Sequence, residues 1–413
     1  MQFIYNAWDE TYKKPFGAVK KGEAIALKVI TDADMVRVVG LGDSVAMEKD
    51  ADGFTLRFTP EKEKGLYFYH FEAVFGDQTR RFGKSEDSGE ACENGRDYQL
   101  TVHSNAPVPE WFKGKTMYQI YVDRFFKGDT TQTRMREHVL MHTSWDEDPV
   151  YIKNDRGEIV LWDFFGGNLA GVIEKLPYIK DLGVDIIYLN PIFEAVSNHK
   201  YDTADYASVD RMYGTDEVLK SLVKKAEALD IKIMLDGVFS HTGEDSIYFN
   251  KYKHYGDGGA YNDKQSPYYP WYHFKKFPDE YDCWWGVKAL PAVNELDPTY
   301  MHYLLDEKDG AVTQWMRAGV AGWRLDVADE LPDAFIRALK DCVLKVNPEA
   351  VLLGEVWEDA SNKVSYETPR EYILGDALDS VSNYPLRDAL IDMLTGRGNA
   401  KEFSGTVMML QEN

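Results

Sequence analysis

The amino-acid sequence predicts an α/β protein in which a parallel barrel of alternating strands and helices follows a smaller antiparallel domain. Two observations predict it. From Met117 onward, short apolar runs alternate with helical patterns, which is typical of a parallel sheet covered by helices. Before that point the strands are short, turn signals separate them, and no helical period interrupts them. We therefore predict one domain over residues 1–105 and a second over residues 106–413.

The first 105 residues carry the pattern of an antiparallel β-sandwich. Strands are expected at 35–39, 54–58 and 66–74, and Asp50-Ala51-Asp52-Gly53 forms a hairpin turn before the second of them. Residues 104–109 contain two prolines and break the pattern, so they are expected to be a linker.

The second domain carries the pattern of a TIM-type (β/α)8 barrel with about six of its eight strands present in this chain. A polar excursion covers residues 127–161, and an irregular stretch after the third strand runs from about 240 to 298. The second stretch is too long for an ordinary loop, so we predict an inserted lid subdomain there. Strands are expected at 117–122, 184–190, 231–236, 322–326, 351–354 and 378–382, and helices at 171–182, 215–229, 300–317, 332–346 and 402–411.

Three of the predicted strands end in an acidic residue: Asp236, Asp326 and Glu355. The carboxyl ends of barrel strands form the rim that carries active sites. Arg324 and Asp326 are two residues apart on a strand and therefore share a face, so the guanidinium is expected to lower the pKa of Asp326. An isolated Arg-x-Asp is more often a structural ion pair, but three acid-ending strands in order favour a catalytic site.

The composition limits the classes of partner. Among 413 residues there are 47 Lys and Arg against 69 Asp and Glu, a net charge of −22, which argues against nucleic acid and anionic membranes as partners. The three cysteines are far apart and predict neither a disulfide framework nor a zinc site. The N-terminus lacks the pattern of a signal peptide and no run of about 18 apolar residues occurs, so a cytoplasmic location is expected.

With these strands placed, six stretches in order resemble the α-amylase family of glycoside hydrolases. Within that family the chain is most similar to the neopullulanase, cyclomaltodextrinase and amylopullulanase group, with the C-terminal part of the barrel lacking. The stretches that carry the resemblance are residues 118–125, 198–206, 236–241, 290–293, 322–330 and 354–357.

The resemblance implies a retaining mechanism on α-linked glucans. Asp326 would attack the anomeric carbon, and Glu355 would protonate the leaving oxygen and then activate water. The two carboxyls need opposite protonation states at one pH, so Glu355 is expected at a less polar site that keeps its proton.

The resemblance also implies substrate-binding roles. Tyr201 matches an aromatic platform under the reacting sugar, His241 and Arg324 match hydrogen-bonding and orienting groups, and Asp236 matches an acid that supports the site. The remaining residues expected to bind substrate are His199, Glu330 and Trp357.

Two departures from the family pattern matter. Related enzymes often bind a structural calcium near residues 127–129 and 166–168, but here Asp129 is the single obvious carboxylate, so calcium is doubtful and no cofactor is required. The family's third acid, an aspartate that follows a histidine, has no counterpart after Glu355. We therefore expect little or no activity from this sequence alone. The third acid is missing either because the sequence is shortened or because the native protein was cut.

The leading hypothesis is a hydrolase of α-1,4 glucosidic bonds in maltodextrins, cyclodextrins or pullulan, with cleavage of α-1,6 bonds left open. A glucanotransferase with the same intermediate and a non-catalytic carbohydrate-binding protein are the alternatives, and a homodimer is left open. Two interpretations of the aromatic residues in the predicted lid are left open: a sugar-binding surface, or the core of the lid. These residues are Tyr268, Tyr269, Trp271, Tyr272, Trp284 and Trp285.

Overall fold

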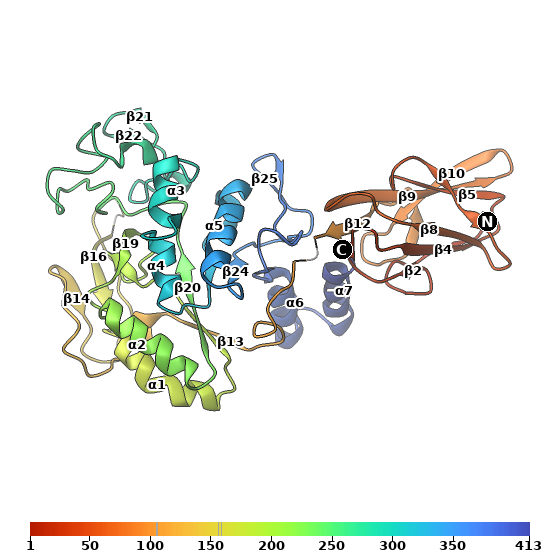
Figure 1. Ribbon diagram of the computed structural model, residues 1–413. Helices are drawn as coiled ribbons and strands as arrows, with labels where there is room; N and C mark the ends of the chain where they lie inside the picture. The colour runs from red at the N-terminus through yellow and green to blue at the C-terminus, as the bar shows by residue number, and fades with distance from the viewer. Residues whose placement is uncertain (105, 156, 158) are drawn as a thin grey trace. The chain divides into compact units, whose positions relative to one another are not determined.

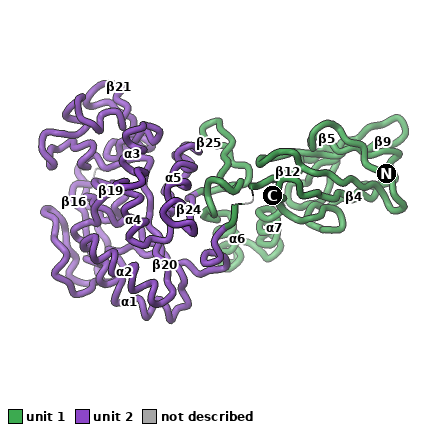
Figure 2. The backbone as a smooth tube through the Cα atoms, viewed as in Figure 1, with its two compact units in different colours: residues 1–107, 356–413 green, residues 108–355 purple. Residues whose placement is uncertain are grey.

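The computed structural model describes residues 1–104, 106–155, 157 and 159–413, which form two compact units (Figure 2). One unit combines residues 1–107 with 356–413, and the other contains residues 108–355. Residue 105, the predicted end of the sandwich, and residues 156 and 158 of the polar excursion lie outside the described residues. The division into domains 1–105 and 106–413, with an inserted subdomain at 240–298, remains a proposal.

The N-terminal part of the first unit consists of two sheets that share one core. Tyr69 and Phe71 alternate with more exposed residues along β9 and belong to the same buried cluster as Leu27 and Val29 of β4. The predicted antiparallel sheets are thus confirmed, with one parallel pair between β3 and β12. The first sheet contains β1 (Phe3–Ile4), β2 (Lys13–Lys14), β4 (Ile25–Thr31), β7 (Glu48–Lys49) and β8 (Phe54–Phe58). The second contains β3 (Val19–Lys20), β5 (Met35–Val39), β6 (Val45–Ala46), β9 (Gly65–Phe75), β10 (Gln78–Lys84), β11 (Ala91–Glu93) and β12 (Tyr98–His103).

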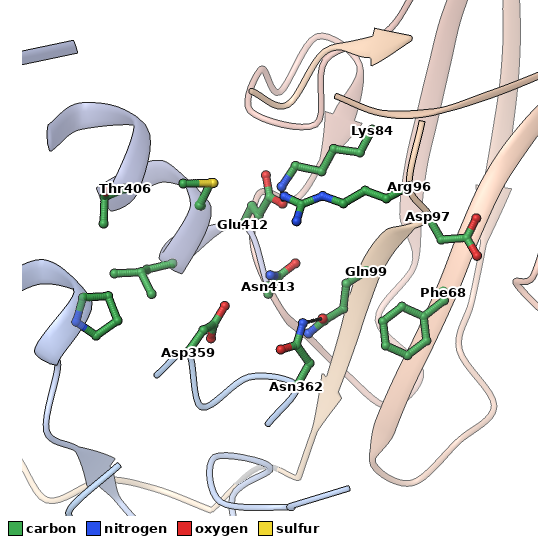
Figure 3. A pocket seen from close by; sticks show the side chains of 13 residues that line it. Phe68, Lys84, Arg96, Asp97, Gln99, Asp359, Asn362, Thr406, Glu412 and Asn413 are labelled. Carbon is green, nitrogen blue, oxygen red and sulfur yellow. Dashed lines mark hydrogen bonds and ion pairs between the residues drawn. The ribbon is translucent and has the colours of Figure 1, made fainter. Parts of the chain in front are cut away.

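Residues 356–413 pack against these sheets within the same unit. Lys64 Nζ lies 2.6 Å from carboxylate oxygens of both Glu371 and Asp376, and Asn362 Nδ2 donates to Gln99 Oε1 at 2.7 Å. Figure 3 shows Gln99 and Asn362 beside a pocket of about 490 Å³. The elements of this segment are β25 (Val364–Ser365), β26 (Thr368–Pro369), β27 (Ser380–Val381), α6 (Tyr384–Thr395) and α7 (Ala400–Gln411).

The unit 108–355 is built on a parallel sheet whose neighbouring strands follow one another in chain order (Figure 1). All four pairings are parallel, as the pattern of apolar strands and intervening helices predicts. These strands fit an incomplete TIM barrel, and the strand predicted at 378–382 is present in the other unit as β27. In order they are β13 (Met117–Ile120), β17 (Ile186–Leu189), β20 (Lys232–Gly237), β23 (Gly322–Leu325) and β24 (Val351–Gly354).

The helices of this unit lie near their predicted positions, with one exception. The single helix predicted over 300–317 is two helices, because Asp306 Oδ1 accepts hydrogen bonds from the N–H groups of Lys308 and Asp309 and forms a turn instead. No helix in the described part of the chain combines the length and apolarity needed to cross a bilayer. The helices are α1 (Leu169–Asp181), α2 (Asp216–Glu227), α3 (Pro298–Leu305), α4 (Ala311–Arg317) and α5 (Asp333–Val346).

The long connections contain short strands of their own. The polar excursion contains β14 (Val139–Met141), β15 (Ile152–Lys153) and β16 (Ile159–Phe164), and the next loop contains β18 (Phe193–Ala195) and β19 (Thr203–Val209). Residues 240–298 contain β21 (Phe274–Lys276) and β22 (Glu280–Tyr281).

The aromatic group within residues 240–298 divides into two parts. Trp271 and Tyr272 are buried, with 2% and 5% of their surface exposed, and they form core. Trp285 is 66% exposed and its ring stacks on Trp284 at 5.2 Å. The core interpretation is therefore confirmed for Trp271 and Tyr272, and sugar stacking by Trp285 stays a prediction.

Candidate active site

Three carboxyl groups and one guanidinium lie together at the carboxyl ends of adjacent strands. Asp236 on β20 is in register with Arg324 on β23, and parallel pairing directs registered side chains to the same face. Glu355 directly follows β24, where Gly354 is in register with Leu325. The sequence-predicted rim of acids is therefore one cluster.

Arg324 binds all three acids. Its Nη1 donates to Asp326 Oδ1 at 2.8 Å and to Asp236 Oδ1 at 3.0 Å, while Nη2 lies 2.9 Å from Glu355 Oε2. The same Glu355 oxygen accepts the N–H of Val327 at 2.9 Å. Glu355 is buried, but the expectation that it lies at a less polar site is wrong, because a guanidinium and a backbone N–H contact it.

Two tyrosines complete the surroundings of Asp236. Tyr201 donates to Asp236 Oδ2 at 3.1 Å, and Tyr188 donates to the same oxygen. The ring of Tyr188 also lies 5.7 Å from the Arg324 guanidinium carbon. Sequence reasoning missed Tyr188, although a tyrosine within the otherwise aliphatic run of β17 was a signal that this position faces polar groups.

Burial raises the pKa of Asp326 to about 8. The neighbouring charge of Asp236 acts in the same direction, and Arg324 opposes both. Burial likewise raises the pKa of Asp236. The expectation that Arg324 lowers the pKa of Asp326 below its ordinary value is wrong, because one guanidinium is shared among three buried carboxyls. The cluster therefore retains a proton near neutral pH.

The predicted sugar platform is held by two histidines. Tyr201 N–H donates to His199 Nδ1 at 3.1 Å, and the two rings stack at 5.9 Å. Burial lowers the pKa of His241 to about 4, so its imidazole is neutral at pH 7. His241 Nε2 lies 3.1 Å from the carbonyl oxygen of Tyr201 and must donate to it, so Nδ1 accepts from the Ser240 hydroxyl at 3.0 Å. The carbonyl oxygen of Tyr201 thereby fixes the tautomer of His241, and the hydroxyl of Ser240 donates to the remaining nitrogen.

Lys200 stabilises the backbone of the loop that carries Tyr201. It is fully buried, and its Nζ lies 3.0 Å from Asp210 and donates to the carbonyl oxygens of Ser197 and Ala195 at 3.0 and 3.3 Å. Asp210 is also fully buried and pairs with Arg136 at 3.0 Å. This ion pair fixes the backbone on both sides of Tyr201.

Replacing Lys200 by methionine is expected to lower the free energy of unfolding by about 2–3 kcal/mol, because Asp210 then keeps a single cationic partner in a buried site. Urea denaturation followed by tryptophan fluorescence measures the change. Lys220→Met is the matched control, since its pair with Glu217 is exposed and is worth less than about 1 kcal/mol. Equal losses in the two variants would contradict the anchoring role.

The two remaining predicted substrate residues lie in different units. Glu330 Oε1 accepts a hydrogen bond from Trp285 Nε1 at 2.9 Å, which ties residues 240–298 to the turn after β23. Trp357 belongs to the unit of residues 1–107 and 356–413, is 51% exposed, and has its ring 6.1 Å from that of Tyr384. Substrate binding by both residues stays a prediction.

The residues at the calcium position of related enzymes do not fit a calcium site here. Asn168 Oδ1 accepts the N–H groups of Gly171 at 2.8 Å and Gly128 at 3.2 Å, so this oxygen caps α1. Asp129 is exposed. Among the described residues, no group of three or more His, Cys, Asp or Glu side chains has a geometry that would hold a metal ion.

Comparison with known proteins identifies the family. The model of the alpha-amylase catalytic domain matches residues 119–412. The chain belongs to the alpha-amylase family. It is 35% identical to the amylopullulanase of Thermoanaerobacterium saccharolyticum over 95% of this chain and 34% of that protein. It is 33% identical to neopullulanase 2 of Thermoactinomyces vulgaris over 81% of this chain and 56% of that protein.

A solved cyclomaltodextrinase shares the fold of this alpha-amylase family chain. The TM-score is 0.65 at 27% identity, and the match covers 99% of this chain and 68% of the cyclomaltodextrinase. The family and its named relatives are glycoside hydrolases. The chain spans about a third of the length of the amylopullulanase that it matches.

Proposed function

We propose that this chain carries the acid groups of a retaining α-glucan hydrolase that cleaves α-1,4 and also α-1,6 bonds in maltodextrins, cyclodextrins or pullulan. The observation that carries the proposal is the joint binding of Asp326 and Glu355 by Arg324, at 2.8 and 2.9 Å. Double displacement requires two neighbouring carboxyl groups, and a guanidinium shared by both supports this role. The names of the amylopullulanase, neopullulanase and cyclomaltodextrinase relatives support the substrate class.

In the proposed first step, Asp326 attacks the anomeric carbon as the bond to the leaving oxygen breaks. This step requires Glu355 as the acid, and its proton passes to the leaving oxygen. Glu355 then becomes an anion, which the N–H of Val327 and the guanidinium of Arg324 stabilise. In the second step Glu355 takes a proton from water, which attacks the glycosyl ester and restores the α configuration.

The binding groups act around this pair. The Tyr201 ring stacks on the sugar, and the neutral imidazole of His241 keeps the backbone of Tyr201 in place. Asp236 holds Arg324 and the hydroxyl of Tyr201 in one orientation. No cofactor takes part. The cytoplasmic location and a homodimer stay predictions.

The anomeric form of the first product tests the reaction. The protein as its gene encodes it is incubated with maltoheptaose, and proton NMR is expected to detect the α anomer before mutarotation. On pullulan, panose marks cleavage of α-1,4 bonds, and maltotriose marks cleavage of α-1,6 bonds. Early appearance of the β anomer would exclude the retaining mechanism, and saturable sugar binding without turnover would favour a binding protein.

A further inference from the structure

A buried histidine outside the acid cluster lies between two carboxylates. His142 Nε2 is 2.8 Å from Asp163 Oδ2, and Nδ1 is 2.9 Å from Glu147 Oε2. Ionised carboxylates only accept hydrogen bonds, so both ring nitrogens donate when both contacts are made, and the ring is an imidazolium. The side chain of His142 is 3% exposed, and its ring stacks on Phe165 at 4.1 Å.

Asp163 connects this histidine to the sugar-binding loop. The other carboxylate oxygen of Asp163 accepts Asn198 Nδ2 at 2.9 Å. Asn198 precedes His199, whose ring stacks on Tyr201. The ring of Trp162, the neighbour of Asp163 on β16, meets His199 edge-on at 5.0 Å. The orientation of Asp163 therefore bears on the position of Tyr201.

The protonated ring of His142 also holds a surface segment, residues 142–150, against β16. Val150 N–H donates to Asp163 Oδ2 at 3.0 Å, the oxygen that also accepts His142. Glu147 accepts the N–H groups of Thr143 and Ser144 at 3.0 and 2.8 Å, so its carboxylate folds the segment around the histidine. Loss of the proton removes one of the two hydrogen bonds of His142, because a neutral ring carries a single N–H, and it also removes the positive charge between Glu147 and Asp163.

We propose that His142 is a positioning residue for the α-glucan site, which as an imidazolium holds segment 142–150 and Asp163 and thereby aligns the loop of Asn198 and Tyr201. The proposal rests on the proposed function. The charged groups that face His142 are Glu147 in its own segment, Asp163 on β16, and Arg124, whose guanidinium lies 4.5 Å from the Phe165 ring and 2.9 Å from Asp163.

The direction of the pH dependence follows from these contacts. The hydrogen bond with Glu147, opposed by burial and assisted by Asp163, raises the pKa of His142 above its ordinary value of 6.5. A group with a raised folded-state pKa holds its proton below the ordinary value and loses it as pH rises through the raised one. The imidazolium therefore holds the segment below pH 6.5, and the segment is released as pH rises through the raised pKa of His142.

The first test needs no catalysis. Histidine NMR, assigned by the signal missing in His142→Gln, is expected to give His142 a pKa above the ordinary value of 6.5. Hydrogen exchange of residues 143–150, corrected for the intrinsic effect of pH, is expected to speed up through the same pH range. In His142→Gln, exchange is expected to be fast at all pH values. An ordinary pKa, or exchange that does not follow it, would overturn the proposal even in an active enzyme.

The second test separates positioning from catalysis. In the unsubstituted protein, the KM for maltoheptaose is expected to rise as pH increases through the pKa of His142. His142→Gln is expected to raise KM about tenfold below that pKa, to change kcat by less than about twofold, and to abolish the pH-dependent rise. Glu147→Gln, which keeps Asp163, is expected to move that rise to lower pH. His302→Gln is the control, since that residue is exposed and lies 3.4 Å from Asp306. Unchanged KM in His142→Gln would overturn the proposal, whereas inactivity of all proteins with the NMR result intact would overturn only the proposed function.

Discussion

Replacing Glu355 by glutamine is expected to lower kcat on maltodextrins by roughly 10²–10⁴-fold, because the leaving oxygen then departs without a proton. Glutamine keeps the size of the side chain and its contact with the N–H of Val327. Glu358→Gln is the matched control, since the side chain of Glu358 is 64% exposed and pairs with Lys363. Initial rates of reducing-sugar release measure the effect.

An activated aryl α-maltoside distinguishes the proposed role of Glu355 from that of Asp326. Its phenol leaves without protonation, so Glu355→Gln is expected to release a burst of phenol equal to the enzyme concentration and then to slow, because no base activates water. Asp326→Asn is expected to give no burst, since no glycosyl ester forms. A burst from Asp326→Asn and none from Glu355→Gln would reverse the two proposed roles.

Replacing Arg324 by methionine is expected to lower the free energy of unfolding at pH 7 by about 3–5 kcal/mol and to abolish hydrolysis. The guanidinium contacts Asp236, Asp326 and Glu355, and its loss leaves three buried acids without their shared cation. Urea denaturation measures stability. Arg397→Met is the control, because its partner Asp392 is exposed and the pair contributes less than about 1 kcal/mol.

The pH dependence of that loss follows from Asp326. Its folded-state pKa is raised from 3.8 to about 8, so between these values the folded protein binds more protons than the unfolded chain. Stability therefore falls as pH rises from about 4 to about 8, by at most about 1.4 kcal/mol per pH unit from this one group. Arg324→Met removes the positive charge that lowers the pKa of Asp326, so the acids are protonated at pH 5. The stability lost by Arg324→Met relative to the unsubstituted protein is therefore expected to be smaller at pH 5 than at pH 8. A loss that is equal at pH 5 and pH 8 would argue against shared protons in the cluster.

Much of the fold could be predicted because a strand buried on both faces leaves a short apolar run in the sequence. The strands ending near Asp236, Asp326 and Glu355 are such runs, and the structure places all three at one edge of the parallel sheet. The break between α3 and α4 was missed, because the helical spacing of apolar residues continues through it. The helix ends there because the side chain of Asp306 accepts hydrogen bonds from backbone N–H groups.

The polar excursion shows a different limit. His142, Asp163 and Asn198 are polar residues whose order in the chain gives no periodic signal; Asp163 lies on β16 and the other two lie outside strands. Their hydrogen bonds join residues 21 and 35 positions apart. Sequence reasoning therefore described residues 127–161 as a polar excursion and gave His142 no role, although His142 binds Asp163, which contacts Asn198.

The amino-acid order alone reveals which acids end which strands, since strand direction and side-chain alternation are local properties. It does not reveal their protonation. Arg324 is two residues from Asp326 and predicted a low pKa, but Asp236 is 90 positions earlier in the chain and competes for the same guanidinium. Burial and that second charge raise the pKa of Asp326 instead. Both depend on packing between distant strands, because electrostatic energies depend on distance through space and on exclusion of water.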